Sequence, residues 1–421
     1  MIDSTPLAGK AVTAVSDRLM RHAIESNTLA VETIEEFAGF ERLAPDWTAL
    51  LDASPSASLF LTWEWLSAWW KHLAGRSRLS IRVVRRRGEL VAVAPLIQRP
   101  PDLGHFLPFR TFEFLGTAAV GSDHLDLIIR RGCEREALAA LAESMSRDGR
   151  LLNLANCNRE SRHLLELATY VGQNGWSISE SPTQACPFIR LSGHSWQSYL
   201  ATLGPAHRYN LKRRLRNLSR HFDVRFDQVN SEKERRDSLA TLVELHNMRW
   251  RRENRSGAFH TAALRAFYDE MSRLALERGW LRLFTLRLDS RPVAALLGFR
   301  YRHVFYFYQS GFDPTYSKNS VGLVAMGLAI KSAIEEGAAE YDMLWGSEPY
   351  KFLWTPEARV LGRLVLYPPG AWGTLSRRLL GLNRMARRMT KRVLIGRGDD
   401  QHRDSVARVG EKWSLRVTPP A

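Results

Sequence analysis

The sequence repeats one pattern in its two halves, and this repeat restricts the fold more than any other feature. A polar turn flanked by β-branched and other apolar residues occurs at residues 85–97 ("RRRGELVAVAPLI") and again at 287–299 ("RLDSRPVAALLGF"), which is typical of a β-hairpin. Helical segments precede both hairpins at the same spacing, "LTWEWLSAWWKHL" and "ALRAFYDEMSRLALERG". The repeat predicts two similar α+β domains. The alternative is a chance likeness between two ordinary hairpins.

The length agrees with two domains, because 421 residues exceed what one hydrophobic core usually supports. We expect residues 1–30 to form a flexible lead, 31–185 a first domain and 186–370 a second domain. Residues 371–421 are expected to form a basic amphipathic helix followed by a disordered tail. The four Trp of "WEWLSAWW" are expected to pack between the domains, with sugar stacking as the alternative.

The charge is unusual, since 60 Lys and Arg against 44 Asp and Glu give a net charge of +16. Such a surplus favours an anionic partner, for example a phosphate-bearing cofactor, nucleic acid or acidic lipid. Nucleic acid is the less favoured of these, because recognised nucleic-acid-binding motifs are absent. The segment "RYNLKRRLRNLSR" (208–220) predicts a basic amphipathic helix, and the basic C-terminal helix predicts either peripheral membrane contact or packing on the body. We find no stretch apolar enough to span a membrane and expect a cytoplasmic location, including the inner face of the membrane.

A turn before a predicted helix has the features of a phosphate site. The strand "VFYFYQSGFD" leads into this turn, and the helix that follows has apolar residues at near-helical spacing. Ser320 is expected to be the N-cap. Free backbone N–H groups and the helix dipole favour an anion at such a position. The candidate donor-binding residues are Ser317, Lys318, Asn319, Ser320, Val321 and Gly322; the alternative is an ordinary capped helix. Metal-ligand motifs such as H-E-x-x-H and C-x-x-C are absent, so we expect no metal.

The order of several motifs resembles the GNAT superfamily, and more narrowly its FemAB-related and CelD-type members. The motifs are "LVELHNMRW" (242–250), "RPVAALLGF", "FYFYQSGFDPTYSKNSVG" and "AIEEGAAEYDMLWGSEPYKFLW", with "FLTWEWLSAWWKHL" and "GSDHLDLII" in the first half. The resemblance covers roughly residues 45–367. It implies tandem GNAT folds, each a mixed, mostly antiparallel sheet flanked by helices.

The resemblance also implies a reaction, the transfer of an acyl group from acetyl-CoA or another acyl-CoA to an amine or hydroxyl. The acceptor would be a small molecule or a glycan related to the cell envelope or to polysaccharides. Residues 317–322 match the family's pyrophosphate turn, although this sequence has a single Gly there and Lys318 as the cation. In the aminoacyl branch of FemAB relatives the donor is aminoacyl-tRNA, which is one alternative. A non-catalytic, membrane-associated scaffold of polysaccharide biosynthesis is another.

The segment "YDMLWGSEPYKFLW" (341–354) follows the donor helix and carries the candidate catalytic residues. By the resemblance, its strand opens into the cleft, where Glu348 is the candidate general base and Tyr350 the candidate acid for the leaving thiolate. Asp342 would orient its neighbours, and Lys351 would hold an anion of the substrate. The alternative is that Asp342 and Lys351 form a structural pair while Glu348 is a solvated loop acid.

His246 and Arg249 share one face of the predicted helix at 242–250. In the family comparison this is the helix where an acceptor docks, so both are candidate acceptor-binding residues together with Lys351. For His246 the alternative is a packing role.

Overall fold

A computed structural model of the chain describes residues 29–101, 110–117, 120–252 and 258–382, with the backbone alone for 250–252. Most of the expected lead and the tail from residue 383 onward lie outside these ranges. None of the helices in the described ranges is long and apolar enough to span a membrane.

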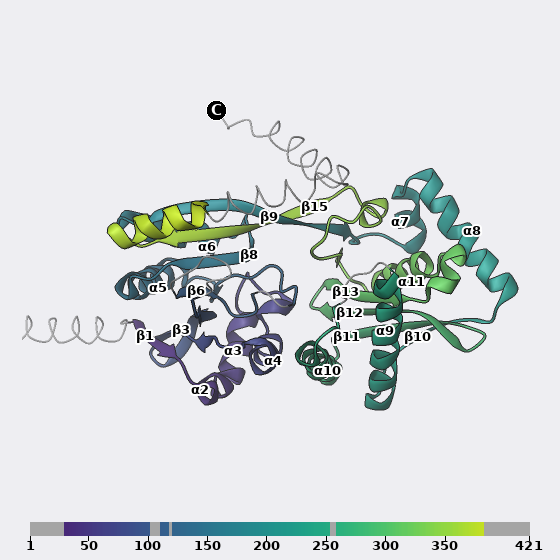
Figure 1. Cartoon of the computed structure of the whole chain (residues 1–421), viewed down its shortest axis with the longest axis horizontal. Helices are drawn as coiled ribbons and strands as arrows, with labels where there is room; N and C mark the ends of the chain where they lie inside the picture. Colours follow the sequence, from purple (N-terminus) through teal and green to yellow (C-terminus); the bar gives the residue numbers. More distant parts are fainter. Residues whose placement is uncertain (1–28, 102–109, 118–119, 253–257, 383–421) are drawn as a thin grey trace, which may run out of the picture.

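The first half contains a small sheet and part of a large one (Figure 1). Strands β1, β3, β4 and β7 form the small sheet in that order, and β5 leaves β4 at Pro95 to pair with β2 and β6. The elements are β1 (Leu29–Ile34), α2 (Phe37–Arg42), α3 (Ala44–Asp52), α4 (Trp63–Leu73), β2 (Arg78–Leu79), β3 (Ile81–Arg86), β4 (Glu89–Ala94), β5 (Leu96–Arg99), β6 (Thr111–Phe114), β7 (Ile128–Ile129), α5 (Glu134–Asp148), β8 (Leu152–Asn158), α6 (Arg162–Gln173) and β9 (Ser177–Arg190). Since β1 begins at Leu29, two residues of the expected lead belong to a strand.

The second half completes the large sheet, whose strand order is β10-β11-β12-β13-β14-β9-β15-β8-β6-β5-β2. Its elements are α7 (Trp196–Thr202), α8 (Pro205–His221), β10 (Val224–Gln228), α9 (Glu232–Arg252), α10 (Ala262–Glu277), β11 (Leu281–Leu288), β12 (Arg291–Tyr301), β13 (Val304–Phe312), the 3-10 helix η3 (Pro314–Asn319), α11 (Val321–Glu335), β14 (Glu340–Asp342), the 3-10 helix η4 (Lys351–Leu353) and β15 (Ala358–Tyr367). Residues 371–382 form a further helix.

The two predicted hairpins are confirmed, as β3–β4 and β11–β12. Their turns also match, because two consecutive residues have positive φ in each: Arg87 (51°) with Gly88 (82°), and Asp289 (49°) with Ser290 (69°). A turn of this kind fits the right-handed twist of the flanking strands. The helices before the hairpins, α4 and α10, pack against each other. The fold is therefore α+β, with tandem GNAT-like halves.

Two strands tie the halves together. β15, from the end of the chain, pairs with β8 on one side and β9 on the other. The last residues of β9 pair with β14 of the second half. Figure 1 shows β9 and β15 running side by side from the blue half toward the green half. A boundary at residue 185 falls inside β9, so the division into domains stays a prediction.

Aromatic packing between the halves agrees with the role expected for the Trp-rich helix α4. Trp65 is fully buried and makes edge contacts with Phe267, Phe299 and Tyr308, with ring centres 5.2, 6.0 and 5.2 Å apart. Phe60 meets Tyr306 in the same way at 5.5 Å. The halves therefore share one continuous core, and β13 is held against α4.

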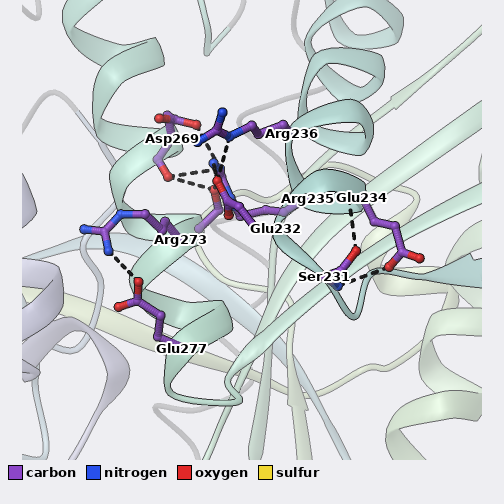
Figure 2. Close-up of polar contacts among 9 residues, drawn as sticks. Ser231, Glu232, Glu234, Arg235, Arg236, Asp269, Arg273 and Glu277 are labelled. Carbon is purple, nitrogen blue, oxygen red and sulfur yellow. Dashed lines mark hydrogen bonds and ion pairs between the residues drawn. The ribbon is translucent and has the colours of Figure 1, made fainter.

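A buried arginine fastens α9 to α10 (Figure 2). The guanidinium of Arg235, only 1% exposed, donates to the Ser272 hydroxyl at 2.7 Å and to the Asp269 carbonyl at 3.1 Å. It also pairs with the Glu232 carboxylate at 2.6 Å. Hydrogen bonds to a charged group are among the stronger ones in proteins, so this cluster fixes the position of α9, which lies against β13.

Candidate active site

The predicted phosphate turn forms at the start of a helix. η3 and α11 meet at Ser320, which is the N-cap residue but makes no side-chain capping bond. The expected N-cap position at Ser320 is therefore confirmed, although the residue is left-handed, with φ of 57°, and its side chain makes no capping bond. Its carbonyl accepts the first helical bond, from Val324 N–H at 3.1 Å. The first N–H groups of any α-helix lack intrahelical partners, so this turn presents donors to an anion.

A cavity of about 300 Å³, here called the donor cavity, opens at this turn. Four of the six predicted donor-binding residues line it, namely Ser317, Ser320, Val321 and Gly322. Lys318 and Asn319 lie in the same turn outside the lining. Lys318 is exposed, and its carbonyl accepts a hydrogen bond from Arg214 of α8.

Arg249 and Tyr350 also line the donor cavity. The Arg249 guanidinium lies 5.5 Å from the centre of the Phe312 ring, on the donor side of β13. Burial raises the pKa of Tyr350, and the nearby Glu348 carboxylate raises it further, so the phenol keeps its proton. The structure thus places Arg249, a predicted acceptor-binding residue, in the wall of the donor cavity.

His246 uses both ring nitrogens within the protein. Its Nδ1 donates to the Ser310 carbonyl at 3.0 Å, and its Nε2 accepts from the Ala258 N–H at 3.0 Å. Burial lowers its pKa, which keeps the ring neutral. The side chain is 2% exposed and lines neither cavity, so this geometry matches the packing alternative.

A second cavity of about 250 Å³ lies between the two halves and is called the interhalf cavity. The first half contributes Asp123 to its wall, and the second half contributes Tyr268, Tyr308, Gln309 and Trp345. Burial raises the pKa of both tyrosines, so both phenols are neutral. The cavity therefore combines aromatic walls with one carboxyl group.

A buried charged network holds that carboxyl group in place. Asp123 is 1% exposed and accepts a hydrogen bond from the Trp345 N–H at 2.8 Å. His124 Nε2 lies 2.8 Å from Asp342 Oδ2, and Asp342 Oδ1 accepts from the Leu344 N–H. Burial raises the pKa of Asp123. For His124 burial acts to lower the pKa, but the carboxylates of Asp342 and Asp123 outweigh it and raise the pKa overall.

Asp342 thus pairs with His124 across the two halves, and Lys351 has other partners. Lys351, 4% exposed, donates to the Trp345 carbonyl at 2.8 Å and pairs with Glu348 at 3.3 Å. The Glu348 side chain is 51% exposed and lines neither cavity. These polar residues therefore hold the turn that follows β14.

The cavities lie on either side of the point where two parallel strands separate. β13 pairs with β14 only from Val304 to Tyr306, and then continues with β12 as its partner but without β14. Its register with β12 shifts at Leu297/Gly298, which marks a bulge beside Tyr308. Beyond the separation, β13 lines the interhalf cavity with Tyr308 and Gln309 and the donor cavity with Ser310 and Phe312.

Comparison with known proteins defines the class. Residues 205–352 match the acetyltransferase (GNAT) domain family. The chain therefore contains an acetyltransferase (GNAT) domain, which covers about a third of its length. Comparison with curated proteins gave no match.

Solved structures show the same fold across both halves. FemX is 11% identical, with a TM-score of 0.56 over 79% of this chain and 96% of FemX. The C-terminal domain of a protein assigned as a lysylphosphatidylglycerol synthetase, from Agrobacterium fabrum, is 11% identical, with a TM-score of 0.51 over 82% of this chain and 95% of that domain. A protein of unknown function from Bacteroides thetaiotaomicron is 12% identical, with a TM-score of 0.50 over 80% and 99%.

Proposed function

We propose that the protein transfers an acyl group from acetyl-CoA or another acyl-CoA to an amine or hydroxyl of a cell-envelope or polysaccharide-related acceptor. One observation carries the proposal: a cavity with a helix N-terminus and a cavity with a buried carboxyl group are lined by consecutive residues of β13, Ser310 and Gln309, just beyond its pairing with β14. The donor occupies the first cavity and the acceptor the second, so that the thioester reaches the acceptor across the gap between the strands.

In the donor cavity, the pyrophosphate lies against the turn at residues 317–322. The N–H groups at Val321 and Gly322 are the donors for it, as at other helix N-termini that bind phosphate. Arg249 and Lys318 add positive charge on two sides. A side chain at position 322 would come within 3.3 Å of the Phe312 ring, so glycine keeps the approach to the helix open.

In the interhalf cavity, Asp123 acts as general base. It takes a proton from the acceptor nucleophile, directly or through water, as the nucleophile attacks the thioester carbonyl. The tetrahedral intermediate is held by a backbone N–H of β13, and its collapse breaks the carbon–sulfur bond. The Tyr350 phenol keeps its proton and donates a hydrogen bond to the leaving thiolate, which takes its own proton from water. We assign the base to Asp123 in place of Glu348, because Asp123 lines the interhalf cavity whereas Glu348 lines neither cavity.

The remaining predicted residues position these groups. His124 and Asp342 fix the loop that carries Asp123, while Lys351 and Glu348 fix the turn at Trp345. These residues therefore affect catalysis only indirectly, by positioning Asp123 and Trp345.

Calorimetric titration with coenzyme A and acetyl-CoA tests the donor site. Arg249→Gln should weaken saturable binding at least about tenfold, the equivalent of one lost charge-assisted contact. Arg236→Gln is the matched control, because Arg236 is an exposed arginine of the same helix, paired with Glu232. Absence of binding to the unsubstituted protein would overturn the acyl-CoA donor.

An aminoacyl-tRNA donor is the second candidate, and the exposed face of α8 favours it. Lys212, Arg216 and Arg220 lie four residues apart along this helix, and within the described part of the chain they form no ion pair with a carboxylate. A stripe of cations at this spacing fits a row of phosphates. An RNA hairpin with a single-stranded 3′ end should bind with strong salt dependence, and should lose this binding when the three residues are changed to Gln. Tight binding of RNA together with none of coenzyme A would favour this candidate.

We also propose peripheral membrane contact through the helix at residues 371–382. Trp372, Leu375 and Leu382 are each about half exposed there, beside the exposed Arg377 and Arg378. Apolar and cationic residues together suit the interface of an anionic membrane, which would put the protein at the inner face. Deletion from residue 371 onward should abolish co-sedimentation with phosphatidylglycerol vesicles and leave coenzyme A binding intact. Vesicle binding without any coenzyme A binding would favour a scaffold.

A further inference from the structure

Trp345 combines a rigid backbone with an exposed side chain. The indole is 53% exposed and lines the mouth of the interhalf cavity. Its main chain is held from both sides, since its N–H donates to Asp123 and its carbonyl accepts from Lys351, each at 2.8 Å. Both of those side chains are buried, at 1% and 4% exposure.

The residues around Trp345 adopt conformations that must be maintained by their surroundings. Leu344 is left-handed, with φ of 54°, and Gly346 has φ of 129°. A Cβ at position 346 would lie 2.2 Å from the Glu348 carboxylate, which folds back over the turn to reach Lys351. Left-handed conformations of ordinary residues are unfavourable and concentrate at sites that hold ligands.

An exposed tryptophan that merely packs on a surface needs none of this support. One half-exposed indole at the edge of a cavity is held in place by a buried lysine and a buried aspartate. Two unusual backbone conformations flank it. Fixing a flat aromatic face in advance reduces the entropy lost when a ligand stacks on it.

We propose that Trp345 is the platform on which the ring of a pyranose sugar stacks, so that the acceptor is a sugar whose amine or hydroxyl points at Asp123. The inference rests on the proposed function. A pyranose has an apolar C–H face for the indole and a polar rim for Asp123 and Gln309, both of which line the cavity. The cavity, about 250 Å³, is smaller than the ~300–1,000 Å³ usual for drug-sized ligands, so it admits a group the size of a single sugar ring.

The test uses the full chain labelled with fluorotryptophan, with the Trp345 resonance assigned through Trp345→Phe. The probes are the β-1,4-linked tetramers of glucosamine and of glucose, with free lysine as a linear amine that has no face to stack. We expect a saturable shift of the Trp345 resonance with at least one tetramer and none with lysine. Trp345→Ala should weaken that binding at least tenfold, and Trp345→Phe should restore part of it. Trp372→Ala should change nothing, because this exposed indole lies in the helix at residues 371–382.

A Trp345 resonance that no tetramer moves would overturn the inference. A shift with lysine and not with the tetramers would overturn the sugar as the ligand. A coenzyme A titration distinguishes failure of this inference from failure of the proposed function. If coenzyme A binds but no sugar shifts the Trp345 resonance, only this inference is rejected. If a sugar shifts the resonance but coenzyme A does not bind, only the acyl-CoA donor is rejected. Trp345→Ala should leave the coenzyme A dissociation constant unchanged, since Trp345 does not line the donor cavity.

Discussion

Gly311 lets helix α9 lie directly on strand β13, and substituting it should disturb both stability and donor binding. A Cβ at this position would lie 2.4 Å from the His246 amide nitrogen and 2.8 Å from the His246 Cα and the Leu245 carbonyl carbon. Ordinary contacts to a Cβ are 3.4 Å or longer. All three neighbours are backbone atoms of α9, so no side-chain rotation can relieve the overlap of about 1 Å.

Gly311→Ala should therefore lower the free energy of unfolding by about 3 kcal/mol, at the upper end of the usual cost of overpacking. Moving α9 away from β13 also withdraws Arg249, one turn beyond His246, from the donor cavity. We expect weaker coenzyme A binding as a result. Urea denaturation and calorimetry measure the two effects.

Gly204→Ala is the control, because no atom lies within 4 Å of a Cβ at that position and its φ of −52° suits any residue. It should change stability by no more than about 0.5 kcal/mol. A loss below about 1 kcal/mol in Gly311→Ala, with normal coenzyme A binding, would refute the close approach of α9.

Three buried charged groups give further predictions. Asp123→Asn should lower kcat for acyl transfer about 10²- to 10⁴-fold and leave coenzyme A binding unchanged; an unaffected kcat would contradict its role. Arg235→Leu should lower the free energy of unfolding, measured by urea denaturation, by about 2 to 3 kcal/mol. Arg236→Leu should change it by almost nothing, because the Arg236 side chain is 70% exposed. Equal losses in the two variants would refute the role of Arg235 in joining α9 to α10. The His124 pair with Asp342 should stabilise the fold fully below pH 6.5 and lose this contribution as pH rises through the raised folded pKa; His124→Gln should remove that slope between pH 6 and 9.

Local sequence signals predicted the hairpins and the donor turn because each forms from neighbouring residues. The turns of the two hairpins could be aligned in the sequence, because the conformation of each turn depends on a few polar residues at the same position of the repeat. The start of α11 followed in the same way from the change from a strand pattern to a helical one. That Ser320 caps α11 without a side-chain hydrogen bond could not be predicted, because its left-handed conformation directly after η3 is not visible in the sequence.

The buried network of Asp123, His124 and Asp342 could not be predicted from neighbouring residues in the sequence. Asp123 and His124 lie in "GSDHLDLII", where a strand forms only at Ile128–Ile129. His124 instead adopts φ of 55°, which turns its ring toward Asp342 in the other half. The sequence offered one signal for this network, namely an aspartate directly followed by a histidine in an apolar stretch. Its partner could be found only from the fold, as could the insertion of β15 between β8 and β9.

The polar residues of the segment 341–354 now have a common explanation. β14 ends at Asp342 while β13 continues, so the chain after Asp342 must pass along the opening between the strands. It reaches the interhalf cavity at Trp345 and the donor cavity at Tyr350, within six positions. The N–H groups of Met343 and Gly346 donate to the Pro187 and Ala185 carbonyls of β9, and Lys351 binds the Leu344 and Trp345 carbonyls. Lys351→Met should therefore impair binding at both cavities, an effect that a residue serving only one ligand would not have.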